Sequence, residues 1–254
     1  MRRRAWIAII VVVVLLAGAF VAGELIARAG IRDRVEQALR GAGVETAAPV
    51  DVGIPGLVLP QLAGGRIGEA TVSAPGVTVQ DITADVQVEL RGVDIHARTA
   101  EEATAEADLD AAALQALIRR AGEGTAWQML GDEAEVAIAE PHVQVSGTVP
   151  VLGAALPLAL TLTPSAQDGL LELAPDRLSV GEWQVERDDL DALPYGVPEA
   201  LSRPIPVCVA EALPRGVVLE RVRVEGDRLI AGFGVDGAIL SDPSTRVPGD
   251  CAQR

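Results

Sequence analysis

The chain has 254 residues, a formal net charge of −15 at pH 7 and two cysteines. Its charge is uneven, because residues 1–40 hold seven Arg against three acids and the remainder holds fourteen Arg against thirty-three acids. A basic surface for phosphate binding is therefore missing from the main part of the chain, which argues against nucleic acid as a partner. Aromatic residues make up only 2% of the chain, so stacking platforms for bases or sugars are not expected either.

The chain begins with three arginines, Arg2 to Arg4, followed by an unbroken apolar run over residues 5–23. As a helix this run would be about 28 Å long, close to the depth of a bilayer's hydrocarbon core. The arginines would stay on the cytoplasmic side. We therefore expect residues 1–23 to form a transmembrane anchor of a single-pass membrane protein whose main domain is extracytoplasmic. The alternative is a cleaved signal segment, with small residues at 21–23 as the cleavage site, and a secreted protein.

The next segment reads as a stalk helix. Ile31, Val35 and Leu39 recur at four-residue spacing between charged residues, and Gly41 and Gly43 would end the helix. The sequence thus predicts a stalk over residues 24–43, before an extracytoplasmic domain over 44–240 and a tail over 241–254.

Residues 50–79 alternate in the manner of strands, broken by turn signals at Pro55-Gly56 and at Ala74-Pro75-Gly76. Residues 85–90 are a clean half-buried strand. Asp108 is then expected to cap a helix that runs to Ala121, with an apolar stripe at four- and three-residue spacing.

Residues 135–162 return to the period of two that is typical of strands. Two hairpins are predicted, one at Gln167-Asp168-Gly169 and one at Gly226-Asp227, and a short helix is expected near Glu199. The fold class is therefore α+β, with an antiparallel sheet packed on one or two helices. Such a sheet has more apolar surface than so few helices can cover, and the uncovered part would form a groove.

No catalytic, cofactor or metal motif stands out. His96 and His142 lie in or near strand patterns without neighbours at zinc-ligand spacing, and Ser146-Gly147 does not fit a nucleophile elbow. Gly64-Gly65 lacks the Lys and Ser/Thr of a phosphate loop. The acidic group Asp188, Asp189 and Asp191 does not match an EF-hand. We therefore expect no enzyme activity, no cofactor and no metal.

Cys208 and Cys251 both lie in the last quarter of the chain. In an oxidising exterior we expect them to form a disulfide that ties the tail to the domain. Two separate thiols are the alternative.

Three segments resemble the LmeA-like phospholipid-binding family of actinobacterial cell envelopes. They are the apolar Pro-containing stretch over 54–67, the Leu-centred helix over 108–118, and the strand at 213–219 with its continuation at 222–227. The resemblance covers most of residues 24–240. It implies an elongated, curved sheet-and-helix fold like that of tubular lipid-binding domains, and no catalytic residues.

The resemblance favours a non-catalytic, lipid-binding protein of the cell envelope that holds phospholipid acyl chains in an aliphatic groove. An acyl chain gains about 0.8 kcal/mol per buried methylene, so such a groove needs no special residue. The alternative function is a membrane-anchored scaffold that contacts other envelope proteins through its sheet edges. The candidate residues for the mouth of the groove, with Arg66 facing a phosphate head group, are Leu57, Val58, Leu59, Leu62, Arg66 and Ile67.

Overall fold

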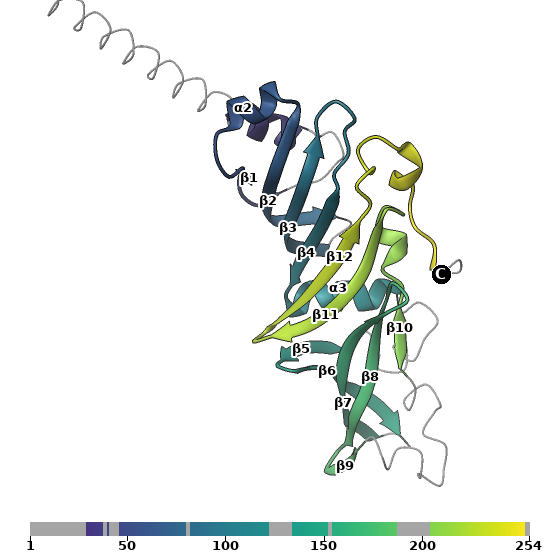
Figure 1. The fold of residues 1–254 in the computed structure, drawn as a ribbon. Helices are drawn as coiled ribbons and strands as arrows, with labels where there is room; N and C mark the ends of the chain where they lie inside the picture. Colours follow the sequence, from purple (N-terminus) through teal and green to yellow (C-terminus); the bar gives the residue numbers. More distant parts are fainter. Residues whose placement is uncertain are drawn as a thin grey trace, which may run out of the picture.

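Two antiparallel sheets and a few helices make up the described part of this computed structural model (Figure 1). The structure describes residues 29–37, 40, 46–79, 82–121, 134–151, 154–186 and 204–251. The predicted membrane segment over residues 5–23 lies outside these ranges, as does the helix expected near Glu199. Across the described ranges, no helix has the length and apolarity that a membrane crossing requires. Residues 29–37 are helical, as predicted for the stalk.

The first sheet, sheet A, carries six strands in the order β1-β2-β3-β4-β12-β11. Strands from both ends of the chain therefore meet in its centre, where β4 pairs with β12. The strands are β1 (Asp51–Gly53), β2 (Arg66–Val79), β3 (Ile82–Asp94), β4 (Glu102–Leu109), β11 (Val217–Glu225) and β12 (Arg228–Val235).

The second sheet, sheet B, has the order β10-β8-β7-β6-β5, and β9 also pairs with β8. Sheet B lies at the opposite end of the elongated molecule from β1 and β2 (Figure 1). Its strands are β5 (Glu135–Ala139), β6 (His142–Val151), β7 (Ala154–Gln167), β8 (Leu170–Val180), β9 (Trp183–Glu186) and β10 (Ile205–Val207).

The main core lies where the two sheets meet around helix α3 (Ala111–Ala121) (Figure 1). Leu114 and Ile118, one helical turn apart on α3, are almost fully buried there. Leu160 and Leu162 on β7 come from the inner face of sheet B, because residues two apart share one face of a strand. The fold is thus sheet-dominated α+β, as predicted, but with two sheets instead of one.

Helix α2 (Val58–Ala63) lies at the far end of sheet A and has a small core of its own. Val58 is fully buried there against Ile54 and Ala70. The sequence predicted only a short apolar patch here. A helix can form because Pro60 stands in its first turn, where no intrahelical partner for a backbone N–H is needed.

Two further predictions need correction. Ala74-Pro75-Gly76 is no turn, because β2 runs through it. The pairing of β2 with β3 shifts its register between Ala74 and Val77 instead. Asp108 is no helix cap, since it belongs to β4 and pairs with Asp85 and Ile230. Asp110 caps α3 instead, its Oδ1 accepting from the Ala113 N–H at 2.8 Å.

Both predicted hairpins are confirmed. Asp168 and Gly169 have φ values of +52° and +75°, which suits the two-residue turn between β7 and β8. Gly226-Asp227 joins β11 to β12, where Glu225 pairs with Arg228. These turns fix the register of the strands that build the core.

Leu160→Ala should lower the free energy of unfolding by about 2–5 kcal/mol, because the Leu160 side chain is 1% exposed and its loss leaves a cavity. Urea unfolding measures this difference. Leu57→Ala is the matched control, because Leu57 is 54% exposed and its loss should cost less than about 0.5 kcal/mol. Equal effects of the two variants would contradict the assignment of the main core.

Candidate functional site

An apolar cavity of about 190 Å³ lies inside the molecule, between the inner face of sheet A and the elements packed on it. It opens partly to solvent. The described residues that line it are all Val, Ile, Leu, Ala or Phe, which are Val77, Ile82, Ala84, Val86, Ala107, Leu109, Leu117, Leu171, Val209, Leu213, Leu219, Val222, Leu229, Ala231 and Phe233.

The floor of the cavity is a row of side chains across four neighbouring strands. Val86 on β3 pairs with Ala107 on β4, and Ala107 pairs with Ala231 on β12. Val222 on β11 then pairs with Ala231. Directly paired residues point to the same face of a sheet. The two central positions, Ala107 and Ala231, carry only a methyl group each, so the floor is lowest there.

A register shift in β11 brings an extra side chain into the cavity. Leu219 and Val222 are three residues apart, and in a regular strand they would face opposite sides. The pairing with β12 shifts between Leu219 and Arg221, so that both side chains turn inward. An alternating pattern in the sequence does not reveal such a shift.

The wall opposite sheet A comes from α3, β8 and the segment around the 3-10 helix η2 (Ala210–Ala212). Val209 and Leu213 flank η2 and both line the cavity. Their segment follows directly on Cys208, which is disulfide-bonded to Cys251 as predicted.

The C-terminal segment holds this wall in place from behind. Gly249 donates its N–H to the Leu213 carbonyl at 2.9 Å, and Arg215 donates to the Val247 carbonyl at 2.8 Å. Gly249 also approaches η2 closely, because a Cβ built on it would lie 2.7 Å from the Ala210 carbonyl oxygen. The disulfide and these backbone bonds together join residues 208–215 to residues 247–251. We call these last residues the C-terminal strap.

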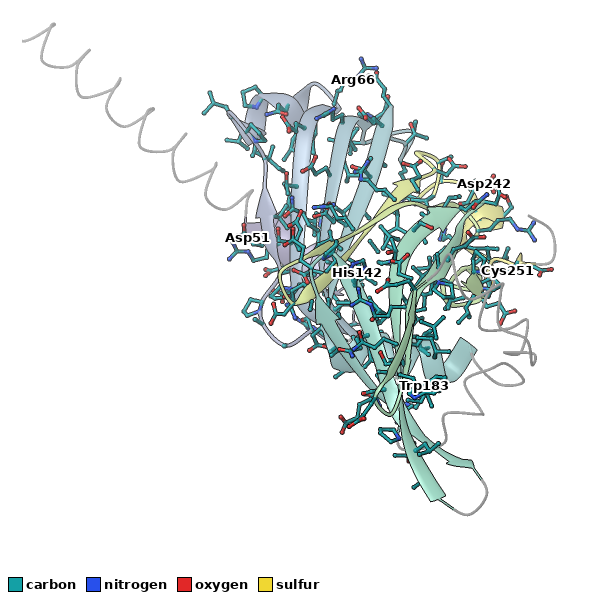
Figure 2. All side chains as sticks on the ribbon, turned by 90° about the horizontal axis from the view of Figure 1, so that it is seen from below. Asp51, Arg66, His142, Trp183, Asp242 and Cys251 are labelled. Carbon is teal, nitrogen blue, oxygen red and sulfur yellow. A yellow bond between two sulfur atoms is a disulfide. The ribbon has the colours of Figure 1, made fainter. Side chains whose placement is uncertain are left out.

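The residues predicted for a groove mouth lie elsewhere, on and beside α2, and none of them lines the cavity. Val58, Leu62 and Ile67 belong to the small core at that end, and Leu57 is 54% exposed. Arg66 lies at the start of β2 (Figure 2), with its guanidinium 3.9 Å from Glu101. Their contact with lipid stays a prediction, as does that of Leu59.

In the sequence, the residues that line the cavity belong to the apolar patterns of separate elements. Val86, Leu117 and Leu229 each belong to an apolar pattern that predicts one element of the core. Their convergence depends on the pairing of β4 with β12, which joins residues more than a hundred positions apart. The one local signal is a pair of small residues, Ala107 and Ala231, at inward positions of strands.

A second hollow, of about 390 Å³, lies over strands β1 to β4 of sheet A, and acidic side chains gather in it. Asp85, Asp108 and the nearby Asp110 surround Arg228, whose Nε lies 2.9 Å from Asp108 Oδ1. Partial burial raises the pKa of Asp108, and Arg228 opposes that rise. Among the described residues, no three His, Cys, Asp or Glu gather as they would around a metal ion.

A group of His142, Thr163 and Asp176 joins β6, β7 and β8 in sheet B. Thr163 donates to Asp176, and His142 Nδ1 lies 3.2 Å from the Thr163 hydroxyl and 3.4 Å from Asp176 Oδ2. One imidazole nitrogen thus faces both partners, and the Thr163 hydroxyl donates its hydrogen bond to the Asp176 carboxylate instead of to the imidazole. A histidine that activates a nucleophile uses separate nitrogens for its two partners. The group therefore ties three strands together without forming a nucleophile relay.

Comparison with known proteins identifies the family of this chain. A family model described as LmeA-like phospholipid-binding matches residues 22–233. The chain belongs to this family, as its sequence resemblance predicted. Comparison with curated proteins gives no match. Comparison with solved structures gives none either. Lipid binding by the family agrees with an interior cavity whose described lining is aliphatic apart from Phe233.

Cys251→Ser should lower the free energy of unfolding by about 2–4 kcal/mol, because the bond closes a loop between residues 43 positions apart. Thermal unfolding with and without reductant measures this. Wild-type protein under reductant should match the variant, and the variant should not respond to reductant. An unchanged stability would contradict the role of the disulfide in holding the C-terminal strap.

Arg228→Ala should destabilise the fold near neutral pH by about 1 kcal/mol, because partly exposed ion pairs contribute little. Without Arg228 the folded pKa of Asp108 rises further above its unfolded value. The resulting loss in the free energy of unfolding is complete at pH values above the folded pKa of Asp108. It disappears as the pH falls and the Asp108 carboxyl takes up its proton. The deficit against wild type should therefore shrink between pH 7 and pH 4.

Urea unfolding at the two pH values tests this prediction. Arg177→Ala is the control, because Arg177 pairs with the exposed carboxylate of Glu186. Its deficit should be smaller than that of Arg228→Ala at pH 7. A deficit of Arg228→Ala that grows as the pH falls would contradict the prediction.

Proposed function

We propose that this protein is a non-catalytic phospholipid-binding protein of the cell envelope and that the cavity between the sheets takes up part of an acyl chain. The observation that carries the proposal is the apolar lining of a partly open interior space. An acyl chain needs only the removal of its methylenes from water, each worth about 0.8 kcal/mol. Family membership supports phospholipid as the ligand.

The size of the cavity limits what it takes up. An apolar cavity of about 150 Å³ in a protein core stays dry and binds benzene. On that scale a volume of about 190 Å³ holds a hydrocarbon segment of about six to eight carbons. We infer that the end of one acyl chain enters, and that the glycerol and phosphate of the lipid stay outside.

Two features of the chain favour a location outside the cytoplasm. A disulfide between Cys208 and Cys251 favours an oxidising compartment, outside the cytoplasm. The apolar run over residues 5–23 favours a membrane anchor or a secretory signal. Both are consistent with a protein that meets phospholipid on the outer side of the cell membrane.

Ala107→Phe should remove the bound acyl chain, because the new ring would occupy the lowest point of the cavity floor. Native mass spectrometry of the full chain, purified in mild detergent, measures the fraction of molecules that carry phospholipid. We expect wild type to carry lipid and the variant to lose it at least about tenfold, since about two buried methylenes account for that factor.

Gln87→Phe is the matched control, because Gln87 is exposed on the opposite face of the same sheet, next to Val86. Circular dichroism shows whether each variant folds. Lipid loss in both variants would contradict an assignment to the cavity. Wild-type protein that is free of phospholipid after equilibration with phospholipid vesicles would contradict the proposed function and favour a scaffold.

A further inference from the structure

The hairpin of β6 and β7 is unusual for this chain because it carries no charge. Residues 143–167 contain no Asp, Glu, Lys or Arg, whereas 22% of the whole chain is charged. The turn between β8 and β9 lies beside the β7 strand of this hairpin, since Leu158 pairs with Val180 and Val180 pairs with Trp183. This is the end of the molecule opposite α2 (Figure 1).

Trp183 is the most exposed large apolar side chain among the described residues, at 80%. It comes directly after the tight turn of Gly181 and Glu182, and Figure 2 labels it above the strands that reach the lower end of the picture. Its pairing partner Val180 and the next residue in that row, Leu158, belong to the inner face of sheet B. The apolar inner face of sheet B therefore continues past the covered core and ends in an exposed indole.

Apolar side chains are exposed on the outer face of sheet B as well. Ala155 and Pro157 on β7 are exposed there, because they alternate with the buried Leu158. The Gly181 N–H donates to the Pro157 carbonyl at 2.9 Å, which holds the turn between β8 and β9 against β7. We call Ala155, Pro157, Val180 and Trp183 the apolar tip. Glu182 is the one charged residue of the turn that carries Trp183, and it is exposed.

We propose that the apolar tip docks onto the surface of a lipid bilayer, with the Trp183 indole at the level of the head groups. Indole rings are amphipathic and prefer the membrane interface, where the ring meets apolar material and the N–H stays near water. A hairpin without charges enters the interface without the cost of removing ions from water. A net charge of −15 excludes a general attraction to anionic lipids, so docking has to come from apolar contact.

The apolar tip is a separate site from the cavity. The inner face of β8 connects the two, from Leu171 in the cavity wall to Val180 at the tip. Nine residues of strand span about 30 Å. Between them, Leu173 and Leu178 are buried in the main core, at 0% and 4% exposure. A change at one site should therefore leave the other intact, and docking can be tested without assuming that the cavity binds lipid.

Fluorescence of Trp183 in the full chain tests the proposal. Trp6→Phe and Trp127→Phe leave Trp183 as the single tryptophan. The chain is mixed with phosphatidylcholine vesicles whose acyl chains are either brominated or unmodified. We expect a blue shift of the emission on addition of vesicles, and a quenching of at least about twofold that depends on bromine.

The matched control moves the tryptophan to another exposed apolar position. Leu240 is 60% exposed, on a turn that follows β12, so Leu240→Trp with Trp183→Phe in the same background reports a surface outside the tip. The proposal requires stronger quenching of Trp183 than of this reporter. Equal quenching of the two would overturn it. Shielding of Trp183 from acrylamide before any vesicle is added would also overturn it, since a protein segment would then cover the tip.

A second measurement separates docking from lipid binding. In the otherwise native chain, Trp183→Ala should slow the uptake of phospholipid from vesicles by delipidated protein, by roughly tenfold, and leave the final occupancy unchanged. Ala107→Phe should lower the occupancy and leave the quenching of Trp183 unchanged. An unchanged uptake rate in Trp183→Ala would overturn a role of the tip in lipid uptake, and the quenching of Trp183 tests docking even in a protein whose cavity binds no lipid.

Discussion

The structure depends on one imbalance: the inner faces of the two sheets present more apolar surface than the elements packed on them cover. Sheet A and sheet B meet at only part of their inner faces, and α3 is the one helix of the main core in the described residues. An aliphatic surface that meets no neighbour loses its dispersion contacts without gaining water. In most proteins larger side chains would fill such a space. Here Ala107 and Ala231 stand at its centre, so the space stays open.

The charged side chains next to the cavity-lining residues of sheet A lie on its outer face, away from the cavity. Neighbouring residues of a strand point to opposite faces, so on β3, β4 and β11 the inward apolar residues alternate with charged or polar residues on the outside. Arg223, beside the inward Val222, holds Glu106 through two guanidinium nitrogens at 3.0 and 3.2 Å and bonds Glu225 as well. These hydrogen bonds raise the pKa of Arg223 above its usual range. The outer face thus ties β4, β11 and β12 together while their inner side chains leave room.

The sequence predicted elements well where one face of a strand is clearly apolar. Residues 85–90 and the hairpins at Gly169 and Gly226 were found because alternation and turn glycines are local signals. β4 was missed because its inward residues are mostly alanine, which strands do not favour and which carries little hydrophobic contrast. One of these alanines, Ala107, lies in the cavity floor. A residue that makes the strand hard to recognise in the sequence therefore also helps to form the site.

Long-range pairing explains why the sequence did not indicate the position of the cavity. The apolar stretch over residues 54–67 carries part of the family resemblance, and the groove was therefore predicted beside it, where α2 lies. In the structure that stretch has a compact core of its own around Val58. The cavity forms instead where strands distant in sequence become neighbours, and no local pattern records which strands will pair.

A small cavity in an elongated molecule also constrains how a lipid can be recognised. If one acyl end fills about 190 Å³, most of the lipid contacts the protein outside the cavity or not at all. The described lining offers no hydrogen-bond donor from a side chain, so selection by head group cannot come from the cavity itself. The cavity can instead select an acyl chain by its shape, because Phe233 and the wall around η2 bound the space that the chain enters. Removing the C-terminal strap would release that limit, which makes the disulfide a determinant of the cavity's shape as well as of stability.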